Sequence, residues 1–438
     1  MPPACLPQTP ASAVIGRMET AELHRRIDAV WRLEAPKLIG ALVRVVRDID
    51  LAEELAQDAL VSALERWPES GIPDNPGAWL MTTARNRGID LLRHRQLAER
   101  KHAMLGGDPD FEPHVMPDFD ALDDDIGDDR LRLIFTACHP VLPHEARIAL
   151  TLRLLGGLTT TEIARAFLQP EPTVAQRIVR AKRTLAEKRV PYDMPRGEER
   201  GERLASVLGV VYLIFNEGYA ATAGEDWMRP ALCEEALRLG RMLAALEPDE
   251  PEVLGLLALM ELQASRTHAR IDATGRPVLL DRQDRTRWDH LAIARGQALL
   301  ARAIRHPDGA GPYTLQAAIA ACHAGASTAA ATDWPRIAAL YAMLAQTAPS
   351  PVIELNRAVA VSRAEGPAAG LALVDAIAGA PALARYAPLP AVRGDLLEQL
   401  GRHDEARDAF LRAAGLTANA SERELLLARA AALEPTDD

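Results

Sequence analysis

The sequence predicts an all-α protein made of several helical domains. Hydrophobic residues occupy 48% of the 438 positions and aromatic residues only 4%. Alanine is abundant where sheets would favour β-branched and aromatic residues. A chain of this length is expected to divide into two to four domains. Segments with the apolar period of amphipathic helices alternate with stretches rich in proline, glycine and acidic residues, so we expect helical domains joined by linkers.

Two breaks predict the domain boundaries. Residues 102–129 hold ten carboxylates and no Lys or Arg, and the segment from Val190 to Glu202 is again rich in charge, proline and glycine. We therefore expect a flexible N-terminal tail at 1–20, a helical domain at 21–101, an acidic linker at 102–129, a second helical domain at 130–190 and a long alanine-rich region at 191–438.

Several classes of protein are disfavoured by composition. The four cysteines are widely spaced without a CxxC pair, which argues against a disulfide framework and predicts reduced thiols. No stretch approaches the roughly 18 apolar residues of a membrane span, and the first residues lack a signal-peptide pattern. We expect a cytoplasmic protein that does not bind membranes.

No catalytic pattern is apparent. The sequence contains no Ser/His/Asp arrangement, phosphate-binding glycine loop or HExxH motif, so we predict no enzyme activity and no cofactor. Cys138, His139 and His144 are metal ligands by type, but the prolines between them and the lack of a fourth ligand favour a packed cysteine with surface histidines.

A 34-residue period is predicted in the C-terminal region. From Gly394 to Ala413 the small and aromatic residues have the offsets of a tetratricopeptide repeat. Steps of 34 residues from Ala406 reach Ala372, Ala338 and Ala236. The alternative is coincidence in an alanine-rich chain. Stacked helix pairs would form a concave surface suited to a protein or peptide partner.

Two segments of this region have open interpretations. The charged segment 266–289 interrupts the period, and either docks on the acidic linker or the first helical domain or is a solvated loop. In "FNEGY", Asn216, Glu217 and Tyr219 either line a pocket or form the polar end of a helix near Gly218.

A helix-turn-helix is predicted between Leu158 and Leu185. A short helix from Thr160 to Phe167 precedes a turn and a second helix that begins near Pro172. The second helix has a predicted buried stripe of Val174, Ile178, Ala181 and Leu185. Its other face carries Thr173, Gln176, Arg177, Arg180 and Arg183. Such a face suits a major groove, although a merely solvated basic face is the alternative.

A second basic helix is predicted from about Gly77 to Arg100. Asn86 and Arg93 share one stripe on this helix, and Arg87 lies on the neighbouring stripe. This face is suited to nucleic acid. The preceding helix instead repeats Asp50, Glu54 and Asp58 at every fourth position, which indicates either a solvated face or a docking surface for a basic protein.

Together these segments resemble a bacterial RNA polymerase sigma factor of the extracytoplasmic-function group. "DLAEELAQDALVSALERW" and "AWLMTTARNRGIDLLRHR" resemble region 2, and "LTTTEIARAF" with "TVAQRIVRAKRTL" resembles region 4. The resemblance covers roughly residues 21–190. The whole chain resembles the subgroup with a C-terminal tetratricopeptide-like extension, in which "YLIFNEGYAATAG" and "DRQDRTRWD" have similar counterparts.

The resemblance implies partners and residue roles. The implied partners are core RNA polymerase, through its β′ clamp helices and β flap, and promoter DNA. It assigns clamp binding to Asp50, Glu53, Glu54 and Asp58. It assigns the −10 element to Arg85, Asn86, Arg87 and Arg93, with Asn86 capturing a flipped base. It assigns the −35 element to Thr173, Gln176, Arg177, Arg180 and Arg183. The unusual turn "LQPEP" leaves open whether Thr173 or Gln176 leads into the groove.

The resulting hypothesis is a transcription initiation factor whose C-terminal repeats regulate its activity and whose acidic linker lies along a basic channel of the polymerase. One alternative is a one-component helix-turn-helix regulator that uses the repeats as a sensor. Another is a repeat scaffold that binds no polymerase. The acidic helix and the Asn86 helix favour the initiation factor, because a simple regulator needs neither.

Overall fold

The computed structural model describes residues 11–106, 117–119, 126–221, 223–272, 276–307 and 309–433. The predicted all-α class is confirmed: within these residues the chain forms eighteen α-helices and a single two-stranded sheet. The chain divides into two compact units, residues 1–165 with 169–207 and residues 208–438 with 166–168. Each unit is described by itself below.

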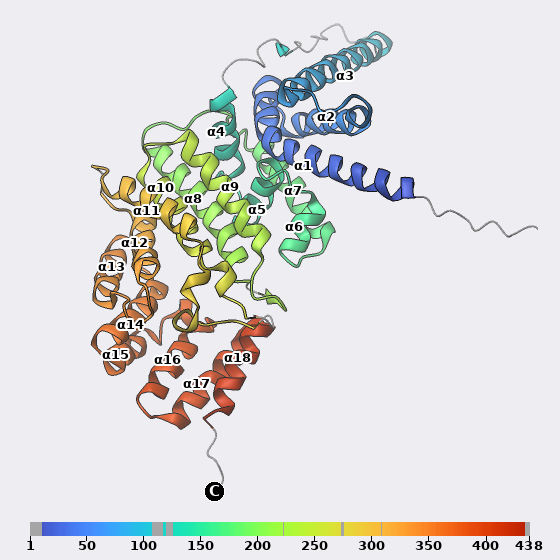
Figure 1. The fold of residues 1–438 in the computed structure, drawn as a ribbon. Helices are drawn as coiled ribbons and strands as arrows, with labels where there is room; N and C mark the ends of the chain where they lie inside the picture. The colour runs from blue at the N-terminus through green and yellow to red at the C-terminus, as the bar shows by residue number, and fades with distance from the viewer. Residues whose placement is uncertain are drawn as a thin grey trace, which may run out of the picture. The chain divides into compact units, whose positions relative to one another are not determined.

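The first unit contains seven helices and the start of an eighth (Figure 1). They are α1 (Ala11–Val46), α2 (Ile49–Ser70), α3 (Pro76–Gly106), α4 (Ile126–Ala137), α5 (His144–Leu154), α6 (Thr160–Ala166), α7 (Glu171–Glu187) and α8 (Gly197–Tyr219). Helix α1 begins inside the stretch expected to be an N-terminal tail. Most of the predicted acidic linker, 107–116 and 120–125, lies outside the described residues.

Helices α1, α2 and α3 pack on one another around an apolar core. Leu38, Leu42 and Leu55 are fully buried there, and each such side chain contributes about 1.5–3 kcal/mol by leaving water. Trp67 of α2 meets Trp79 of α3 edge to face, with ring centroids 5.3 Å apart. This aromatic contact holds α2, which contains the predicted polymerase-binding acids, against α3, which contains the residues predicted to bind the −10 element.

Helix α4 is tied to α1 by a buried carboxylate. Asp129 has no exposed surface, and its two oxygens accept from Nε of Arg44 at 2.9–3.0 Å and from Nη1 of Arg132 at 2.8 Å. The hydroxyl of Tyr192 bonds to the carbonyls of Gly40 and Asp129 at 3.0 and 2.9 Å. The last acid of the predicted linker is therefore a structural residue, not part of a free acidic chain.

The beginning of α8 completes the first unit. Arg203 Nη2 donates to the carbonyl of Phe135 at 3.0 Å, and the Ser206 hydroxyl donates to the carbonyl of Cys138 at 2.6 Å. Arg147 of α5 donates to the same hydroxyl at 2.6 Å. These bonds satisfy carbonyls at the end of α4, which has no intrahelical partners for them.

The second unit is a succession of packed helices (Figure 1). They are α9 (Pro230–Leu246), α10 (Pro251–Ala264), α11 (His290–Ile304), α12 (Pro312–Gly325), α13 (Trp334–Thr347), α14 (Pro351–Glu365), α15 (Pro367–Ile377), α16 (Pro388–Gln399), α17 (His403–Leu416) and α18 (Ala420–Ala431). Short 3-10 helices are η2 (Thr267–Ala269), η3 (Leu280–Arg282), η4 (Arg285–Arg287) and η5 (Pro381–Leu383).

A small parallel sheet links distant parts of this unit. Strand β1 (Ala223–Gly224) pairs with β2 (Ala418–Asn419). The buried side-chain amide of Asn419 donates to the carbonyls of Ala221 and Asp226 at 3.1 and 2.9 Å. The sheet thereby joins two segments of the second unit that are nearly two hundred residues apart in the sequence.

Helix pairs are present, but the 34-residue period is only partly reflected in their packing. Ala406 is fully buried, and a Cβ added to Gly394 would lie 2.8 Å from the Phe410 ring, so α16 and α17 cross closely at a glycine. Ala372, by contrast, is exposed. The close contact of α15 with α14 is made instead at Gly370, where an added Cβ would lie 2.5 Å from Ser362.

Two arginines of the charged segment 266–289 pack against their own unit. Arg270 is 7% exposed and lies over the Tyr219 ring at 3.6 Å. Arg285 lies over the Trp288 ring at 4.6 Å and donates to the carbonyls of His323 and Ala326 at 2.6 and 2.7 Å. The solvated-loop interpretation is therefore wrong for these arginines, which are structural.

"FNEGY" also has a structural role. Gly218 allows α8 to approach α9 so closely that an added Cβ would lie 2.5 Å from the backbone nitrogen of Cys233. Glu217 forms an ion pair with Arg229, and Tyr219 stacks on Phe215 with centroids 5.6 Å apart. The polar end of a helix, not a pocket, is the observed arrangement.

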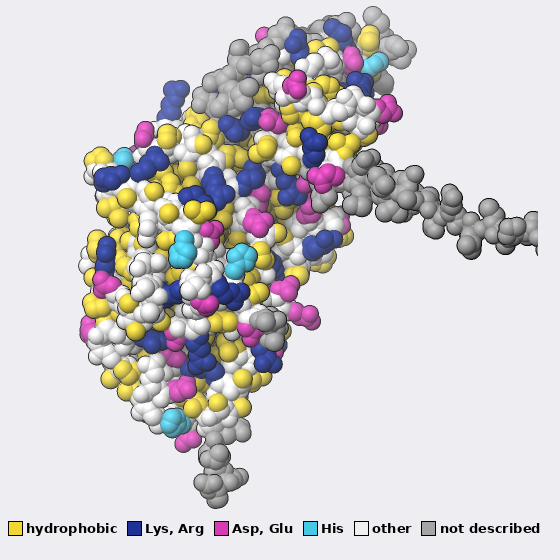
Figure 2. Space-filling view, in the orientation of Figure 1, with side chains coloured by type: hydrophobic (Ala, Val, Ile, Leu, Met, Phe, Trp, Pro, Cys, Tyr) yellow, Lys and Arg dark blue, Asp and Glu magenta, His cyan; other side chains and the backbone are white. Residues whose placement is uncertain are grey.

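In the face shown in Figure 2, acidic and basic side chains are interspersed among apolar ones. Among the described residues, no helix combines the length and apolar character that crossing a membrane requires.

Candidate nucleic-acid interface

Helix α7 has one buried and one exposed face. Val174, Ile178, Ala181 and Leu185 are all buried, so the predicted apolar stripe is confirmed. This stripe packs α7 into the first unit beside α5. Most of the remaining positions of the helix are thereby turned outward, as the helical repeat requires.

The turn before α7 is set by local chemistry. Helix α6 begins with a reciprocal cap, in which Glu162 Oε2 accepts from the Thr159 N–H at 2.8 Å and Thr159 Oγ1 accepts from the Glu162 N–H at 3.1 Å. Leu168 has a φ of 50°, a left-handed conformation that costs a non-glycine residue about 1–2 kcal/mol. Helix α7 then begins at Glu171, one residue before the position expected from Pro172.

Four of the five residues predicted to face duplex DNA are exposed: Thr173, Gln176, Arg180 and Arg183. Arg177 is half-buried, and its Nη1 donates to Oε1 of Gln169 in the turn at 2.7 Å. Arg183 pairs with Glu187 at 2.6 Å, and the hydrogen bond to that carboxylate raises the pKa of Arg183. The side chains of Gln176 and Arg180 make no hydrogen bond within the described chain.

Helix α3 exposes the residues predicted to contact the −10 element. Asn86, Arg87 and Arg93 are exposed, whereas Arg85 is half-buried. Arg87 Nε lies 4.0 Å from Asp58 of α2. A residue predicted to contact the −10 element therefore lies beside a residue predicted to bind the polymerase.

The opposite side of α3 holds a piece of the predicted linker. Gly88 is buried, and a Cβ built there would lie 2.7 Å from the ring of Phe119 and 3.1 Å from Leu55. Phe119 is 4% exposed. This described fragment of the linker, 117–119, is therefore anchored on α3 two positions from Asn86.

The acidic residues of α2 are divided between two surroundings. Glu54 is exposed and Asp58 is half-exposed beside α3. Asp50 and Glu53 instead reach α7, where Lys182 Nζ lies 2.7 Å from Asp50 and 2.5 Å from Glu53. The four predicted polymerase-binding carboxylates thus do not form one open surface in this structure.

Glu53 is the centre of a buried ion-pair cluster. Its side chain is 8% exposed and also accepts from Arg153 Nε of α5 at 2.5 Å. We call Glu53, Arg153, Lys182 and Asp50 the α2–α7 clasp. Burial opposes the charge on Lys182, but attraction to Glu53 and hydrogen bonds to Asp50 and Glu53 outweigh it, so the pKa of Lys182 is raised.

The sequence interpretation missed Lys182 and Arg153. A signal for Lys182 was present, because it follows the buried Ile178 by four residues and so lies beside the apolar stripe. A charge in that position needs a partner. Nothing local indicates that the partner is Glu53, which is far away in the sequence.

The candidate metal residues are arranged as a packed thiol and peripheral histidines. Cys138 is buried, its sulfur lies 3.3 Å from the Thr151 hydroxyl, and burial raises the pKa of its thiol to about 11. His144 is exposed. A thiol so hard to ionise is a poor metal ligand at neutral pH.

Three family models match the chain. Sigma-70 region 2 matches residues 30–97, sigma-70 region 4 matches 132–185, and a family of unknown function (DUF6596) matches 203–304. The two sigma regions thus cover α2, most of α3 and the helix-turn-helix of α6 and α7. The family matched by residues 203–304 is not described as a tetratricopeptide repeat, so the repeat character of this region remains a prediction.

Individual relatives agree with these matches. The chain is 46% identical over 398 residues to the uncharacterized protein R00370 of Rhizobium meliloti (strain 1021), covering 90% of this chain and 93% of that protein. It is 30% identical over 155 residues to the ECF RNA polymerase sigma factor SigK of Mycobacterium tuberculosis (strain H37Rv), covering 34% of this chain and 78% of that protein. SigK of Mycobacterium ulcerans (strain Agy99) is 29% identical over 154 residues.

The chain therefore belongs to the sigma-70 family of RNA polymerase sigma factors, which are not enzymes in their own right. Within that family about a third of the chain is similar to the ECF sigma factor SigK, and residues 203–304 match the family of unknown function.

Proposed function

We propose that this sigma factor binds core RNA polymerase and directs it to −35 and −10 promoter elements. The observation that carries the proposal is the outer face of α7. Gln176 and Arg180 project from a helix-turn-helix whose other face is fully committed to packing. An amide and a guanidinium are the groups that read adenine and guanine in the major groove.

Contact with the −10 element is proposed for α3. Asn86 offers both a donor and an acceptor to a base edge, and Arg87 and Arg93 supply positive charge for the strand backbone. Arg85, being half-buried, is better placed to support the helix than to track the strand. In this proposal the exposed side of α3 contacts the melted strand, while Trp79 and Gly88 hold the helix against its neighbours.

Docking to the β′ clamp helices is proposed for the acidic helix α2. Glu54 and Asp58 are accessible without rearrangement, whereas Asp50 and Glu53 are held by Lys182. A polymerase surface that engages all four carboxylates must compete with the α2–α7 clasp. Core binding would then open the clasp and release α7 from α2.

The C-terminal region is proposed to regulate the sigma module through a protein or peptide partner. Its support is the succession of helix pairs, an architecture that commonly presents extended binding surfaces. The acidic linker is proposed to lie along a positively charged polymerase channel, except at Phe119 and Asp129, which are packed in this structure.

A binding experiment tests the polymerase assignment. Core polymerase is captured on beads and challenged with the full-length protein or with the double variant Glu54→Lys/Asp58→Lys. Because both residues lie at the surface, the fold should be unaffected within about 0.5 kcal/mol, while core binding should fall at least tenfold. The matched control is Glu65→Lys/Glu69→Lys, which changes two exposed acids in the later turns of α2. Unaltered capture of the first variant would support the one-component regulator instead.

A further inference from the structure

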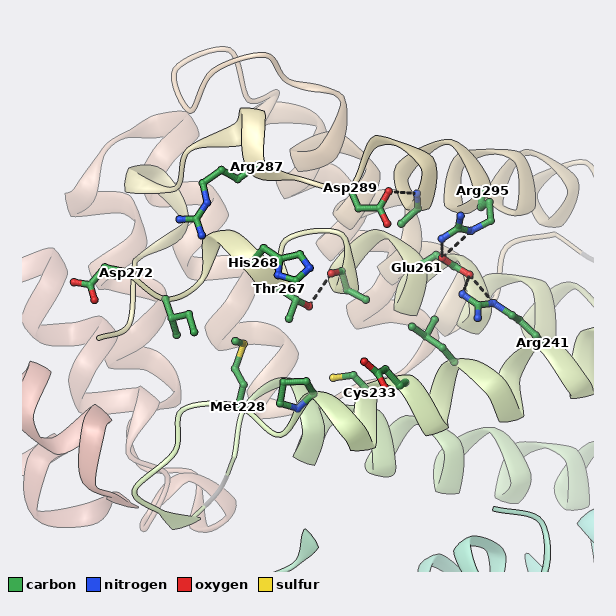
Figure 3. A pocket seen from close by; sticks show the side chains of 16 residues that line it. Met228, Cys233, Arg241, Glu261, Thr267, His268, Asp272, Arg287, Asp289 and Arg295 are labelled. Atoms are coloured by element: carbon green, nitrogen blue, oxygen red, sulfur yellow. Dashed lines mark hydrogen bonds and ion pairs between the residues drawn. The ribbon is translucent and has the colours of Figure 1, made fainter. Parts of the chain in front are cut away.

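The second unit contains a cavity that no part of the sigma-factor assignment uses. Its volume is about 750 Å³, within the usual range for small organic ligands. It lies between α9, α10 and the start of α11, with η2 and η4 along its edge (Figure 3). The matched family that includes this region has no known function.

One end of the cavity is built on a buried carboxylate held by two arginines. Glu261 of α10 is 2% exposed. Its Oε1 accepts from Nε and Nη2 of Arg241 at 3.0 and 2.6 Å, and its Oε2 accepts from Nε and Nη2 of Arg295 at 3.1 and 2.9 Å. Figure 3 shows the two guanidinium groups meeting at Glu261 from α9 and α11.

This arrangement leaves hydrogen-bond donors unused. Both arginine side chains are about half exposed, at 51% and 49%. Each arginine uses its Nε and Nη2 groups to bind Glu261, so its Nη1 group has no hydrogen-bond partner in the described chain. Glu261 thus pairs with two guanidinium groups, and Asp289 adds a second attraction on Arg295.

Two of the other acids that line the cavity each use one carboxylate oxygen to accept from backbone N–H groups. Asp289 Oδ1 accepts from the N–H groups of Leu291 and Ala292 at 2.9 and 3.0 Å, at the start of α11. Asp272 Oδ1 accepts from the N–H of Arg276 at 3.0 Å. Glu234 lies at the surface. The remaining lining includes the apolar side chains of Leu237, Ala264 and Ala292.

We propose that this cavity binds a small organic anion whose carboxylate or phosphate oxygens accept from Arg241 and Arg295. A planar guanidinium edge matches both oxyanions. The apolar body of the ligand would lie along Leu237 and Ala264. At the far end, Arg287 makes no ion pair within the described residues and offers a second anchor.

The site joins three helices, and this gives binding a structural effect. Arg241 belongs to α9, Glu261 to α10 and Arg295 to α11. An anion shared by the two arginines would add a further link between α9 and α11. The inference goes beyond the proposed promoter function and does not depend on it, because it concerns binding to the free protein.

Calorimetric titration of the full-length protein with citrate and with glucose 6-phosphate tests the proposal. Both titrations are made at constant ionic strength, with choline chloride and glucose as cationic and uncharged controls. We expect one of the two anions to bind with a Kd below 5 mM and the controls not to bind. The preferred anion distinguishes a carboxylate ligand from a phosphate ligand.

Variants connect binding to the cavity. Arg295→Gln should weaken the Kd at least tenfold, and Arg287→Gln, which leaves the Glu261 cluster intact, should weaken it at least threefold. The matched control is Arg238→Gln, an arginine of α9 that pairs with Glu235 and lies outside the cavity. The proposal is overturned if neither anion binds below 5 mM, or if Arg287→Gln and Arg295→Gln both bind as tightly as the parent.

Discussion

Lys182 and Arg183 are neighbours in the sequence with opposite environments. The Lys182 side chain is 10% exposed and pairs with α2, whereas that of Arg183 is 76% exposed. Successive residues of a helix are turned by about 100°, so a basic run in a recognition helix divides into structural and available cations. Counting charge in "RAKRTL" therefore overestimates the DNA-binding face, and solvent exposure separates the two roles.

Arg180 is the residue of α7 for which we expect the largest effect on promoter binding. It is exposed and makes no side-chain bond within the described chain, so Arg180→Ala should leave the fold intact and cost about 1–3 kcal/mol if the side chain reads a base. Fluorescence anisotropy of the polymerase holoenzyme on −35 duplex variants measures this. Lys188→Ala, which changes an exposed cation just past the end of α7, is the matched control. Unchanged affinity for Arg180→Ala would remove this residue from the interface.

Asn86 should affect melting more than duplex binding. Capturing a flipped base must offset an unstacking cost of a few kcal/mol, and Asn86 is exposed on α3 for such a contact. In Asn86→Ala, permanganate reactivity of −10 thymines should fall at least tenfold while footprints over −35 persist. Asp90→Ala, an exposed change one turn later on the same helix, is the control. Parallel loss of both signals would indicate a structural role instead.

His323 should make the second unit sensitive to acid. Its ring lies against Trp334 at 5.2 Å, and burial, followed by repulsion from Arg266 and Arg285, lowers its pKa to about 4. The unfolded chain has a histidine pKa of about 6.5. The unfolded state thus binds more protons below that value, so stability is complete above pH 6.5 and is lost as the pH falls toward 4, by about 3 kcal/mol in total.

Urea unfolding of the full-length protein at pH 7.5 and pH 4.5 measures this loss. The variant His323→Gln should lose about 2–3 kcal/mol less between the two pH values than the parent does. His290→Gln, which changes an exposed histidine at the start of α11, is the control and should behave like the parent. Equal losses in all three proteins would contradict the role of His323.

At the scale of elements, the α2–α7 clasp is the contact whose loss should be most costly. Glu53→Gln leaves Arg153 without its carboxylate and Lys182 with only the exposed Asp50, and removal of one member of a buried ion pair costs about 3–5 kcal/mol. Chemical denaturation of the full-length protein should show a loss of this order in the first unit. Glu54→Gln changes an exposed neighbour and should cost less than about 0.5 kcal/mol. Equal stabilities of the two variants would mean that the clasp contributes little.

Elements with a strong local pattern could be predicted from the sequence. The buried stripe of α7 followed from the spacing of Val174 and Ile178, and its start was predicted within one residue from Pro172. The packing of helix pairs in the second unit was predicted less well, because an alanine-rich helix has many small residues at which a neighbouring helix could approach. The close contact fell on Gly370 and not on Ala372, which the 34-residue period had favoured.

The charged segment shows why the remaining structure could not be predicted. The charged neighbours of Arg270 and Arg285 left two alternatives open, docking on the linker or the first domain and a solvated loop. Their partners are instead the Tyr219 ring and the carbonyl of His323. These partners are 51 and 38 residues away in the sequence. The same limit applies to Glu53, whose partners Arg153 and Lys182 become visible only when the helices are packed.

At the scale of the whole molecule, the boundary of the sigma module lies beyond the end of region 4. Arg203 and Ser206 of α8 bind the end of α4, and residues up to 207 belong to the first compact unit. A truncated protein 1–192 should therefore be less stable than 1–207, by about 1–3 kcal/mol for the buried carbonyls left without partners. Thermal unfolding of both fragments tests this, and equal midpoints would contradict it.

The central claim is most directly tested by run-off transcription with purified core polymerase and the promoter of the protein's own operon. The account predicts a discrete transcript that requires the full-length protein, falls at least tenfold with Arg180→Ala or with Glu54→Lys/Asp58→Lys, and persists with Lys188→Ala. It also predicts a changed yield for 1–207, because the C-terminal region is proposed to regulate the module. Absence of any transcript above that of core polymerase alone, with the protein folded and bound to the promoter duplex, would contradict the assignment and favour a one-component regulator.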